Sequence, residues 1–265
     1  MFENRRHLDI TRPKIKDSVL GKLRNGLAGP AFLIQMKSDH REIDKYMAKY
    51  TKKKSPKKVF VIEKDDDLAK SLKENFKDQL TIINDDILNI NENLLFDEKV
   101  TVFGNLPYNI SSEILSKWIT NLEDNFWFEH LVLMFQKEVA DRIIAKFNTA
   151  AYGRLSILSN WKLNVKKICD IKPESFSPRP KIDSSLLYFS PKKNFLKIKD
   201  PKNLEKITRI FFRHRRKMLK SPFNQIFNGD QKILDKLSIN LNLRPQNLDF
   251  TTYYELTREY ENLRS

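Results

Sequence analysis

Cysteine and histidine are scarce in this chain of 265 residues. Cys169 is the only cysteine, and the four histidines, at positions 7, 40, 130 and 214, show no spacing typical of metal ligands. An internal disulfide and a cysteine-rich zinc site are therefore excluded. We expect no metal ion, and a reducing, cytoplasmic compartment.

Long apolar runs are missing as well. The stretch 131–135 is among the longest, far below the roughly 20 residues that a membrane-spanning helix needs. The first residues include arginines but also Glu3 and Asp9, and no apolar segment follows them, so we expect neither a secretion signal nor a membrane partner. With 40% hydrophobic residues, the chain can still bury one substantial core and a small second domain.

Charge is distributed unevenly along the chain. Basic residues outnumber acidic ones by 16 to 6 over 1–58 and by 17 to 8 over 191–265, whereas acidic residues prevail by 20 to 16 over 59–190. Such a distribution fits a protein that attracts a phosphate backbone and holds a small cofactor elsewhere. A proteome rich in lysine explains the same charge equally well.

The hydrophobic pattern predicts an α/β fold from residue 58 onward. Short β-branched runs alternate with amphipathic stretches, which is typical of a mostly parallel, Rossmann-like sheet. We expect strands at 58–63, 80–83, 100–104, 131–135, 165–171 and 184–189, and helices at 66–76, 111–119, 137–147 and 154–161. After Pro191 the pattern is helical, for example at 204–212 and 233–241. The predicted parts are an aberrant segment 1–57, a Rossmann-like domain 58–190 and a small helical domain 191–265.

Three consecutive predicted strands end in polar residues. Glu63 suits the two hydroxyls of a ribose, and Asp86 suits an adenine amine, while Asn105 closes the third strand. Taken singly, Glu63 is a weak signal, and for Asp86 a turn or N-cap aspartate is the favoured interpretation. Their recurrence on the ligand-binding side of the sheet favours a site.

The run Asn105, Leu106, Pro107, Tyr108 matches one chemistry closely. The N6 amine of adenine is a poor nucleophile, and carbonyl oxygens from Asn105 and Leu106 can accept its protons and favour the attacking form. Pro107 stiffens the loop, and Tyr108 offers a face on which an extruded base can stack. The alternative is an Asx-Pro turn with a buried tyrosine, which is common.

Five ordered motifs strengthen the first interpretation. They are GNLPYNIS at 104–111, QKEVA at 136–140, AYGRLS at 151–156, FSPRPKIDS at 176–184, and Phe212 followed by RRK at 215–217. This series closely resembles the small-subunit ribosomal RNA adenine N6-dimethyltransferases. The resemblance implies a Rossmann-like domain that uses S-adenosylmethionine, a helical C-terminal domain, and dimethylation of two adjacent adenines near the 3′ end of 16S rRNA, without a metal. A monomer that acts in ribosome biogenesis is expected.

The resemblance also implies roles for individual residues. Glu63 would hold the cofactor ribose, Asp86 the cofactor adenine, and Asn105 with Leu106 the target amine. Asn105 would also contact the cofactor. The target base would stack on Tyr108, with Phe176 on its other face. Contacts to the RNA backbone would come from Arg154, Lys181, Arg213, Arg215, Arg216 and Lys217. Arg154 is equally plausible as a partner in a structural ion pair.

Two family motifs are missing ahead of Glu63, a Gly-Gln-Asn-Phe-Leu segment and a glycine-rich turn. The chain has only six glycines, and those at 21, 26 and 29 follow no recognisable strand. Residues 36–42 can be encoded by codons that, read two bases along, give Glu-Ile-Gly-Pro-Gln-Gly-Asn. We hypothesise a frameshift from near residue 15 to about residue 45, in which case the N-terminal charge is uninformative and cofactor binding is impaired. We also expect the first strand of the sheet to be missing.

Other functions remain open. A non-catalytic RNA-binding factor for small-subunit assembly would keep the basic surface and lose the cofactor. Methylation of 23S rRNA or of DNA would keep the chemistry and change the substrate, although the motifs at 152–154 and 176–184 favour the small-subunit enzyme.

Overall fold

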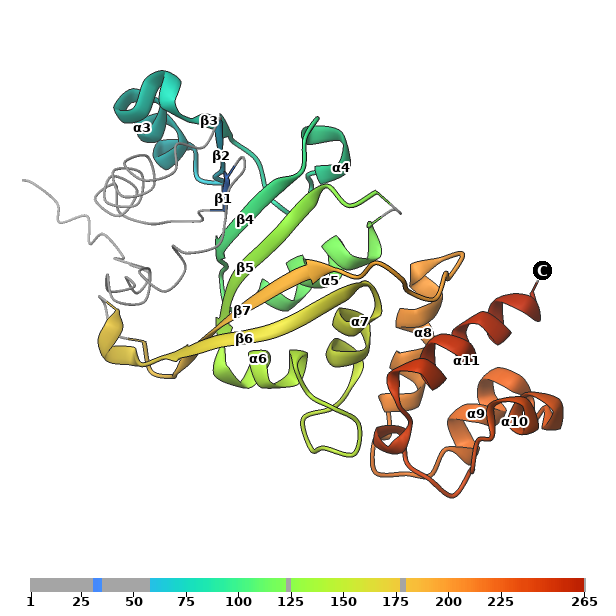
Figure 1. Ribbon diagram of the computed structural model, residues 1–265. Helices are drawn as coiled ribbons and strands as arrows, with labels where there is room; N and C mark the ends of the chain where they lie inside the picture. Colours follow the sequence, from blue (N-terminus) through green and yellow to red (C-terminus); the bar gives the residue numbers. More distant parts are fainter. Residues whose placement is uncertain (1–30, 35–57, 123–124, 177–179, 265) are drawn as a thin grey trace, which may run out of the picture.

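The computed structural model describes residues 31–34, by their backbone alone, and residues 58–122, 125–176 and 180–264 (Figure 1). Within this part of the chain a seven-stranded sheet has the order β3-β2-β1-β4-β5-β7-β6. The strands are β1 Ala31–Ile34, β2 Val59–Ile62, β3 Thr81–Ile83, β4 Val100–Asn105, β5 Phe128–Gln136, β6 Leu163–Ile171 and β7 Ser184–Pro191. All pairs are parallel except those of β7 with β5 and β6. The predicted α/β fold is confirmed.

Strand β1 occupies the centre of the sheet. It pairs in parallel with β2, Ala31 opposite Val59, and with β4, Ala31 opposite Thr101. The expectation that the first strand is missing is therefore wrong. The four residues 31–34 are all apolar, which is typical of a central strand in a parallel sheet. The predicted glycine-rich turn would fall at 36–42, outside the described residues.

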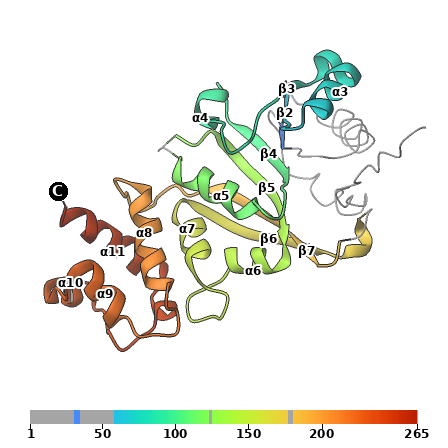
Figure 2. The ribbon, with the colours of Figure 1, turned by 180° about the vertical axis from the view of Figure 1, so that it is seen from behind.

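Helices follow most of the strands along the chain (Figures 1 and 2). They are α3 Asp66–Phe76, α4 Glu92–Leu95, α5 Ser111–Thr120, α6 Lys137–Ile143, α7 Arg154–Lys162, α8 Pro201–Phe212, α9 Lys220–Phe227, α10 Gln231–Leu237 and α11 Phe250–Asn262, with short 3₁₀ turns η1 Lys77–Gln79, η2 Pro173–Ser175 and η3 Pro245–Asn247. Asp65 is the N-cap of α3, and its side-chain carboxylate accepts a hydrogen bond from the backbone N–H of Leu68. Acidic residues in the first turn interact favourably with the helix dipole.

Alternation along the strands divides the core between two faces of the sheet. On one face α5, α6 and α7 cover a large cluster to which the strands contribute Ile62, Val100, Val102, Leu131, Leu133, Phe135, Leu163, Leu187 and Phe189. On the other face Val59 and Val61 pack against Leu72 and Phe76 of α3. A third cluster lies on this second face, over β4, β5 and β7. It contains Phe103, Val132, Met134, Ile171, Phe176 and Leu186. Phe176, which lies in the loop after η2, thereby approaches the end of β4.

Helix α6 is shorter than the pattern predicts. It ends at Ile143 instead of position 147, although no glycine or proline stops it. Asn148 has a φ of 67°, its N–H donates to the carbonyl of Gln246 at 2.8 Å, and its side-chain oxygen accepts from Asn247 at 2.8 Å. Hydrogen bonds to a segment about 100 residues away therefore hold the chain that follows this helix in a non-helical course.

The helical C-terminal part packs directly on the sheet domain. Helix α8 contacts α7 and α11, and the hydroxyl of Tyr254 donates to the carbonyl of Ile157 at 2.9 Å. Leu204, Phe211 and Tyr254 belong to the same hydrophobic cluster as the α5–α7 side of the sheet. The longest helix among the described residues, α11, has 13 residues, too few to span the apolar part of a bilayer.

Candidate functional site

The polar strand ends meet at one edge of the sheet. Strands β3, β2, β1 and β4 are neighbours and run parallel, so their carboxyl ends share an edge. Glu63 follows β2, the turn with Asp86 follows β3, and Asn105 is the last residue of β4. In open α/β sheets ligands bind outside the carboxyl ends of the strands. The fold therefore brings these three predicted residues to one edge.

Glu63 is almost completely buried, with 1% of its surface exposed. Its Oε1 accepts from the Asp65 N–H at 2.9 Å, and its own N–H donates to the carbonyl of Ile83 at 3.0 Å, across the ends of β2 and β3. The backbone bonds orient the carboxylate at the sheet edge. A carboxylate in this place can accept hydrogen bonds from a vicinal diol.

Asp86 lies in a tight turn. Its Oδ1 accepts from the Leu88 N–H at 3.0 Å, and its Oδ2 pairs with Nζ of Lys64 at 2.7 Å. The hydrogen bond from Lys64 and the backbone bond from Leu88 hold the pKa of Asp86 below its ordinary value, so the group is ionised at neutral pH. Asp86 is thus a turn aspartate whose outer oxygen faces an exposed ammonium. An adenine amine would take the place of Lys64 at Oδ2.

The close approach of β4 to β5 explains the glycine before Asn105. A Cβ on Gly104 would lie 2.7 Å from Cδ2 of Leu133 and 3.1 Å from Cδ2 of Leu106, closer than carbon atoms pack. A side chain at this position would require the Leu133 and Leu106 side chains to shift, and Asn105 is half-buried at the end of the strand.

The carbonyl groups after Asn105 are used differently. The carbonyl of Pro107 accepts from the Ile110 N–H at 3.1 Å, and the carbonyl of Tyr108 accepts from Oγ of Ser111 at 3.2 Å. Among the described residues none donates a hydrogen bond to the carbonyl of Leu106. The loop thus keeps one main-chain acceptor available beside the Asn105 amide, which is the pair needed to accept the two protons of an amine.

Tyr108 and Phe176 both pack in the third cluster, the one that contains Phe103 of β4. The hydroxyl of Tyr108 is 2.6 Å from Oγ of Ser184, the first residue of β7. Phe176 is only 6% exposed and packs with Met134 and Leu186. The structure thus anchors the tyrosine ring, whereas stacking of a base on Phe176 requires that ring to turn outward.

A charged network, not evident in the sequence, braces the same corner. Asp170 on β6 pairs with Nζ of Lys167 at 2.7 Å and Nζ of Lys137 at 3.1 Å, and its Oδ1 accepts from Oγ of Ser185 at 2.6 Å. Ser185 follows the anchor of Tyr108 directly. Partial burial alone raises the pKa of Asp170, but hydrogen bonds from Lys167, Ser185 and Lys137 more than offset it and hold that pKa well below its usual range.

The lowered pKa of Asp170 predicts a loss of stability in acid. A carboxyl whose folded pKa is depressed contributes stability above its unfolded pKa of 3.8, and this contribution disappears as pH falls from there toward the folded pKa. Because the side chain is 36% exposed, we expect Asp170→Asn to lower the free energy of unfolding at pH 7 by less than about 1 kcal/mol. Urea unfolding at pH 7, 4 and 3 measures it, with exposed Asp97→Asn as the control. Equal acid sensitivity of the Asp170 variant and the parent would contradict the assignment.

The predicted RNA-contacting residues lie in three places. Arg154 at the start of α7 and Lys181 before β7 are exposed, and Arg154 forms no ion pair with any described residue. Arg213, Arg216 and Lys217 are exposed in the turn after α8. Arg215 instead bridges two loops: its Nε donates to Oε1 of Gln246 and its terminal nitrogen to the carbonyl of Thr149, both at 3.1 Å.

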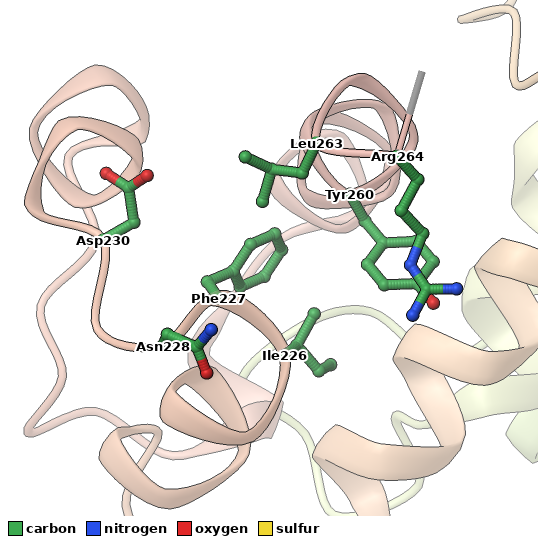
Figure 3. A pocket seen from close by; sticks show the side chains of 7 residues that line it. All are labelled: Ile226, Phe227, Asn228, Asp230, Tyr260, Leu263 and Arg264. Carbon is green, nitrogen blue, oxygen red and sulfur yellow. The ribbon is translucent and has the colours of Figure 1, made fainter.

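A cavity of about 510 Å³ lies elsewhere, between the ends of α9 and α11 (Figure 3). Its walls are Ile226, Phe227, Asn228, Asp230, Tyr260, Leu263 and Arg264. None of the predicted site residues lines it, so it is separate from the sheet-edge site.

The residues at the sheet edge suit a nucleoside cofactor. The carboxylates of Glu63 and Asp86 follow neighbouring strands, the first placed to accept hydrogen bonds from hydroxyls and the second from an amine. Among the described residues, no group of three or more His, Cys, Asp or Glu could hold a metal ion. This donor set fits S-adenosylmethionine, whose ribose would be held by Glu63 and whose adenine by Asp86.

Comparison with known proteins agrees with this arrangement. The model of the family "Ribosomal RNA adenine dimethylase" matches residues 46–262. Ribosomal RNA small subunit methyltransferase A of Pelagibacter ubique is 68% identical over 215 residues, which cover 81% of this chain and 82% of that protein. The protein of the same name from a Wolbachia strain of Drosophila simulans is 39% identical over 210 residues, covering 78% and 76%.

Solved structures support the fold. A dimethyladenosine transferase from Plasmodium falciparum superposes with a TM-score of 0.76 at 23% identity, covering 95% of this chain and 98% of that one. The 23S rRNA methyltransferase ErmE gives a TM-score of 0.63 at 17% identity, covering 94% and 99%. Because the family match spans most of the chain, this protein belongs to the ribosomal RNA adenine dimethylases.

Proposed function

We propose that this chain transfers methyl groups from S-adenosylmethionine to N6 of two adjacent adenines near the 3′ end of 16S rRNA. The observation that carries the proposal is the Leu106 carbonyl, to which no described residue donates, next to the Asn105 amide at the edge where Glu63 and Asp86 also lie. The names of the relatives from Pelagibacter and Wolbachia support the small ribosomal subunit as the substrate. We further propose a monomer that acts in the cytoplasm.

The residues of the chain perform positioning rather than proton abstraction. S-adenosylmethionine supplies an electrophilic methyl group on a sulfonium. Oxygen atoms of Asn105 and Leu106 accept hydrogen bonds from the two N6 protons and direct the nitrogen lone pair out of the ring plane toward that methyl. The carbon–sulfur bond would break as the nitrogen–carbon bond forms, with S-adenosylhomocysteine as the leaving group, and one N6 proton would then pass to water. Tyr108, anchored by Ser184, holds the base by stacking. Such alignment of reactants accounts for a large part of the rate in displacement reactions.

The basic loops offer a surface for the RNA backbone. The loop after α6, the turn after α8 and the segment before η3 are joined by the bonds of Arg215 and by the Leu219 N–H, which donates to the carbonyl of Leu243 at 2.8 Å. We call this the basic loop surface; its exposed members are Lys146, Phe147, Arg213, Arg216, Lys217, Met218, Leu243 and Arg244. Cations around exposed apolar side chains suit phosphates and unpaired bases together.

Phe147 has the feature that distinguishes this surface from a merely charged one. Its ring is 45% exposed, beside the cationic turn. We expect Phe147→Ala to weaken binding to 30S particles by about 5- to 100-fold, the range for loss of one aromatic stacking contact. Leu94→Ala, at an 84% exposed leucine on α4, is the control and should bind like the parent.

The salt dependence of RNA affinity distinguishes the stacking contact of Phe147 from the ionic contacts of the surface. Arg216→Ala should reduce the slope of log affinity against log salt by about one, whereas Phe147→Ala should leave that slope unchanged. Fluorescence anisotropy with a labelled 3′-terminal fragment of 16S rRNA at several salt concentrations provides both values. Parent-like affinity of both variants would place the RNA elsewhere.

The proposed function is tested by primer extension across the 3′ end of 16S rRNA. Cells that lack this gene should show no stop at the two adenines, and a plasmid copy should restore it. Purified chain with S-adenosylmethionine should methylate 30S particles from the deletion strain. Restored particle assembly without any methylation would instead support a non-catalytic assembly factor.

A further inference from the structure

Lys117 on α5 reaches the turn that carries Asp86. Its Nζ donates to the carbonyls of Ile87, at 2.7 Å, and of Ile90, and it pairs with Glu92 at 2.8 Å. An ammonium group has three N–H donors, and here all three are used. The lysine side chain is 16% exposed and the glutamate side chain 2%, so this ion pair is largely shielded from water.

Glu92 is held from a second side as well. Its Oε1 accepts from Nε1 of Trp118 at 2.7 Å, and Trp118 itself is 1% exposed. Removing two charges from water is costly, and a buried ion pair is weak evidence for a role in stability, because apolar side chains of similar volume often serve as well. What apolar side chains could not do is bind two carbonyl groups of the turn at once.

The bonded carbonyls control the orientation of Asp86. Ile87 follows Asp86 directly, the Asp86 side chain accepts from the Leu88 N–H, and the Asp86 carbonyl accepts from the Asn89 N–H at 2.8 Å. Asp86 thus closes the turn by accepting from its N–H groups, and Lys117 fastens the turn to α5 by donating to its carbonyl groups. Rotation of the turn would move the carboxylate and break both sets of bonds.

Helix α5 connects this turn with the target loop. At its first residue, Ser111 bonds to the carbonyl of Tyr108, and Lys117 lies six residues later. Six residues of α-helix span about 9 Å and form a rigid spacer. The helix that starts at the proposed target-base loop therefore also fastens the proposed adenine-binding turn.

We propose that Lys117 is a positioning residue for the adenine subsite, and that it acts by fastening the Asp86 turn to α5. The proposal rests on the proposed role of Asp86. Lys117 does not touch the cofactor; it sets where the Asp86 carboxylate stands relative to the loop that holds the target base.

The test keeps the buried charge balanced. Glu92→Gln alone retains the bonds from Lys117 to the turn and serves as the matched reference. Adding Lys117→Met removes these bonds without leaving an unpaired buried carboxylate. In the full chain, we expect this second change to weaken binding of S-adenosylhomocysteine, measured by equilibrium dialysis, by about tenfold, as expected for loss of a charge-assisted hydrogen bond. The turnover number at saturating S-adenosylmethionine should change less than about threefold, because the target loop is intact.

A double-mutant cycle identifies the route of the effect. With Asp86→Asn already present, Lys117→Met should weaken S-adenosylhomocysteine binding by less than about threefold, since coupled residues are not additive. Full additivity would overturn the proposal. If Asp86→Asn alone left S-adenosylhomocysteine binding unchanged, the assigned role of Asp86 would be refuted, and this inference with it. Weakening by Asp86→Asn but not by Lys117→Met would refute only the inference.

Amide hydrogen exchange tests the proposal even if the affinity for S-adenosylhomocysteine is too weak to measure. The amides of Leu88 and Asn89, which bond to Asp86, should exchange about tenfold faster when Lys117→Met is added to Glu92→Gln, because the turn opens locally. The melting temperature reports any global loss of stability. Unchanged exchange of these two amides would overturn the proposal.

Discussion

Replacing Asn105 by alanine lowers the rate of adenine methylation by about 10²- to 10³-fold, the range found when one preorganised hydrogen-bonding group that stabilises a transition state is removed. The amide oxygen accepts a hydrogen bond from N6 while positive charge develops on that nitrogen. Binding of the RNA should change little, because the basic loop surface lies elsewhere on the chain.

The Asn105→Asp variant sharpens this prediction. A carboxylate oxygen in the same place still accepts this hydrogen bond, so this variant should retain more activity than the alanine variant. Single-turnover methylation of 30S particles from a deletion strain gives the rates, and filter binding gives the affinity for RNA. Asn121→Ala, at the exposed C-cap of α5, is the control and should methylate like the parent. Equal turnover by Asn105→Ala and the parent would reject the assigned role.

Restoring a glycine-rich turn upstream of residue 58 tightens binding of S-adenosylhomocysteine by roughly 100-fold. Restoring the alternative frame over codons 36–42 alone leaves β1 as written, between β2 and β4, and places the glycines just after it. A glycine turn at that position lets the backbone approach the cofactor. Two backbone hydrogen bonds to its charged methionine end contribute about 3 kcal/mol, equivalent to that factor. The family match, which begins at residue 46, agrees with a discontinuity just before it.

The nucleotide sequence provides the first check. Translation of the gene in all frames should yield a glycine-rich segment upstream of the codon for Lys58, and its absence would rule out the frameshift. Calorimetry then compares the written and the frame-restored chains. Glu63→Gln in the restored chain is the control: it should weaken the regained binding, because the restored turn and the ribose contact belong to one site.

Local sequence patterns predict most of the sheet domain. The helix at 66–76 and the parallel strands that follow depend on apolar periodicity and on capping by Asp65, which act over a few residues. The polar strand ends were likewise predictable as a group, since parallel strands place their carboxyl ends at one edge. Strand β1 was not predicted, because four apolar residues without alternation become a strand only between neighbours that supply their hydrogen bonds.

The sequence by itself determined the α/β class, the order of the strands' polar ends and the residue types of the Asn105–Tyr108 loop, because these follow from short-range periodicity and composition. Only the tertiary structure decided which carbonyl of that loop stays available, how Ser184 anchors Tyr108, and that Arg215 joins two loops. It also brought Lys117 to the Asp86 turn, 30 residues away from Ile87. Such contacts depend on side chains that meet only after the chain has folded, and no local pattern encodes them.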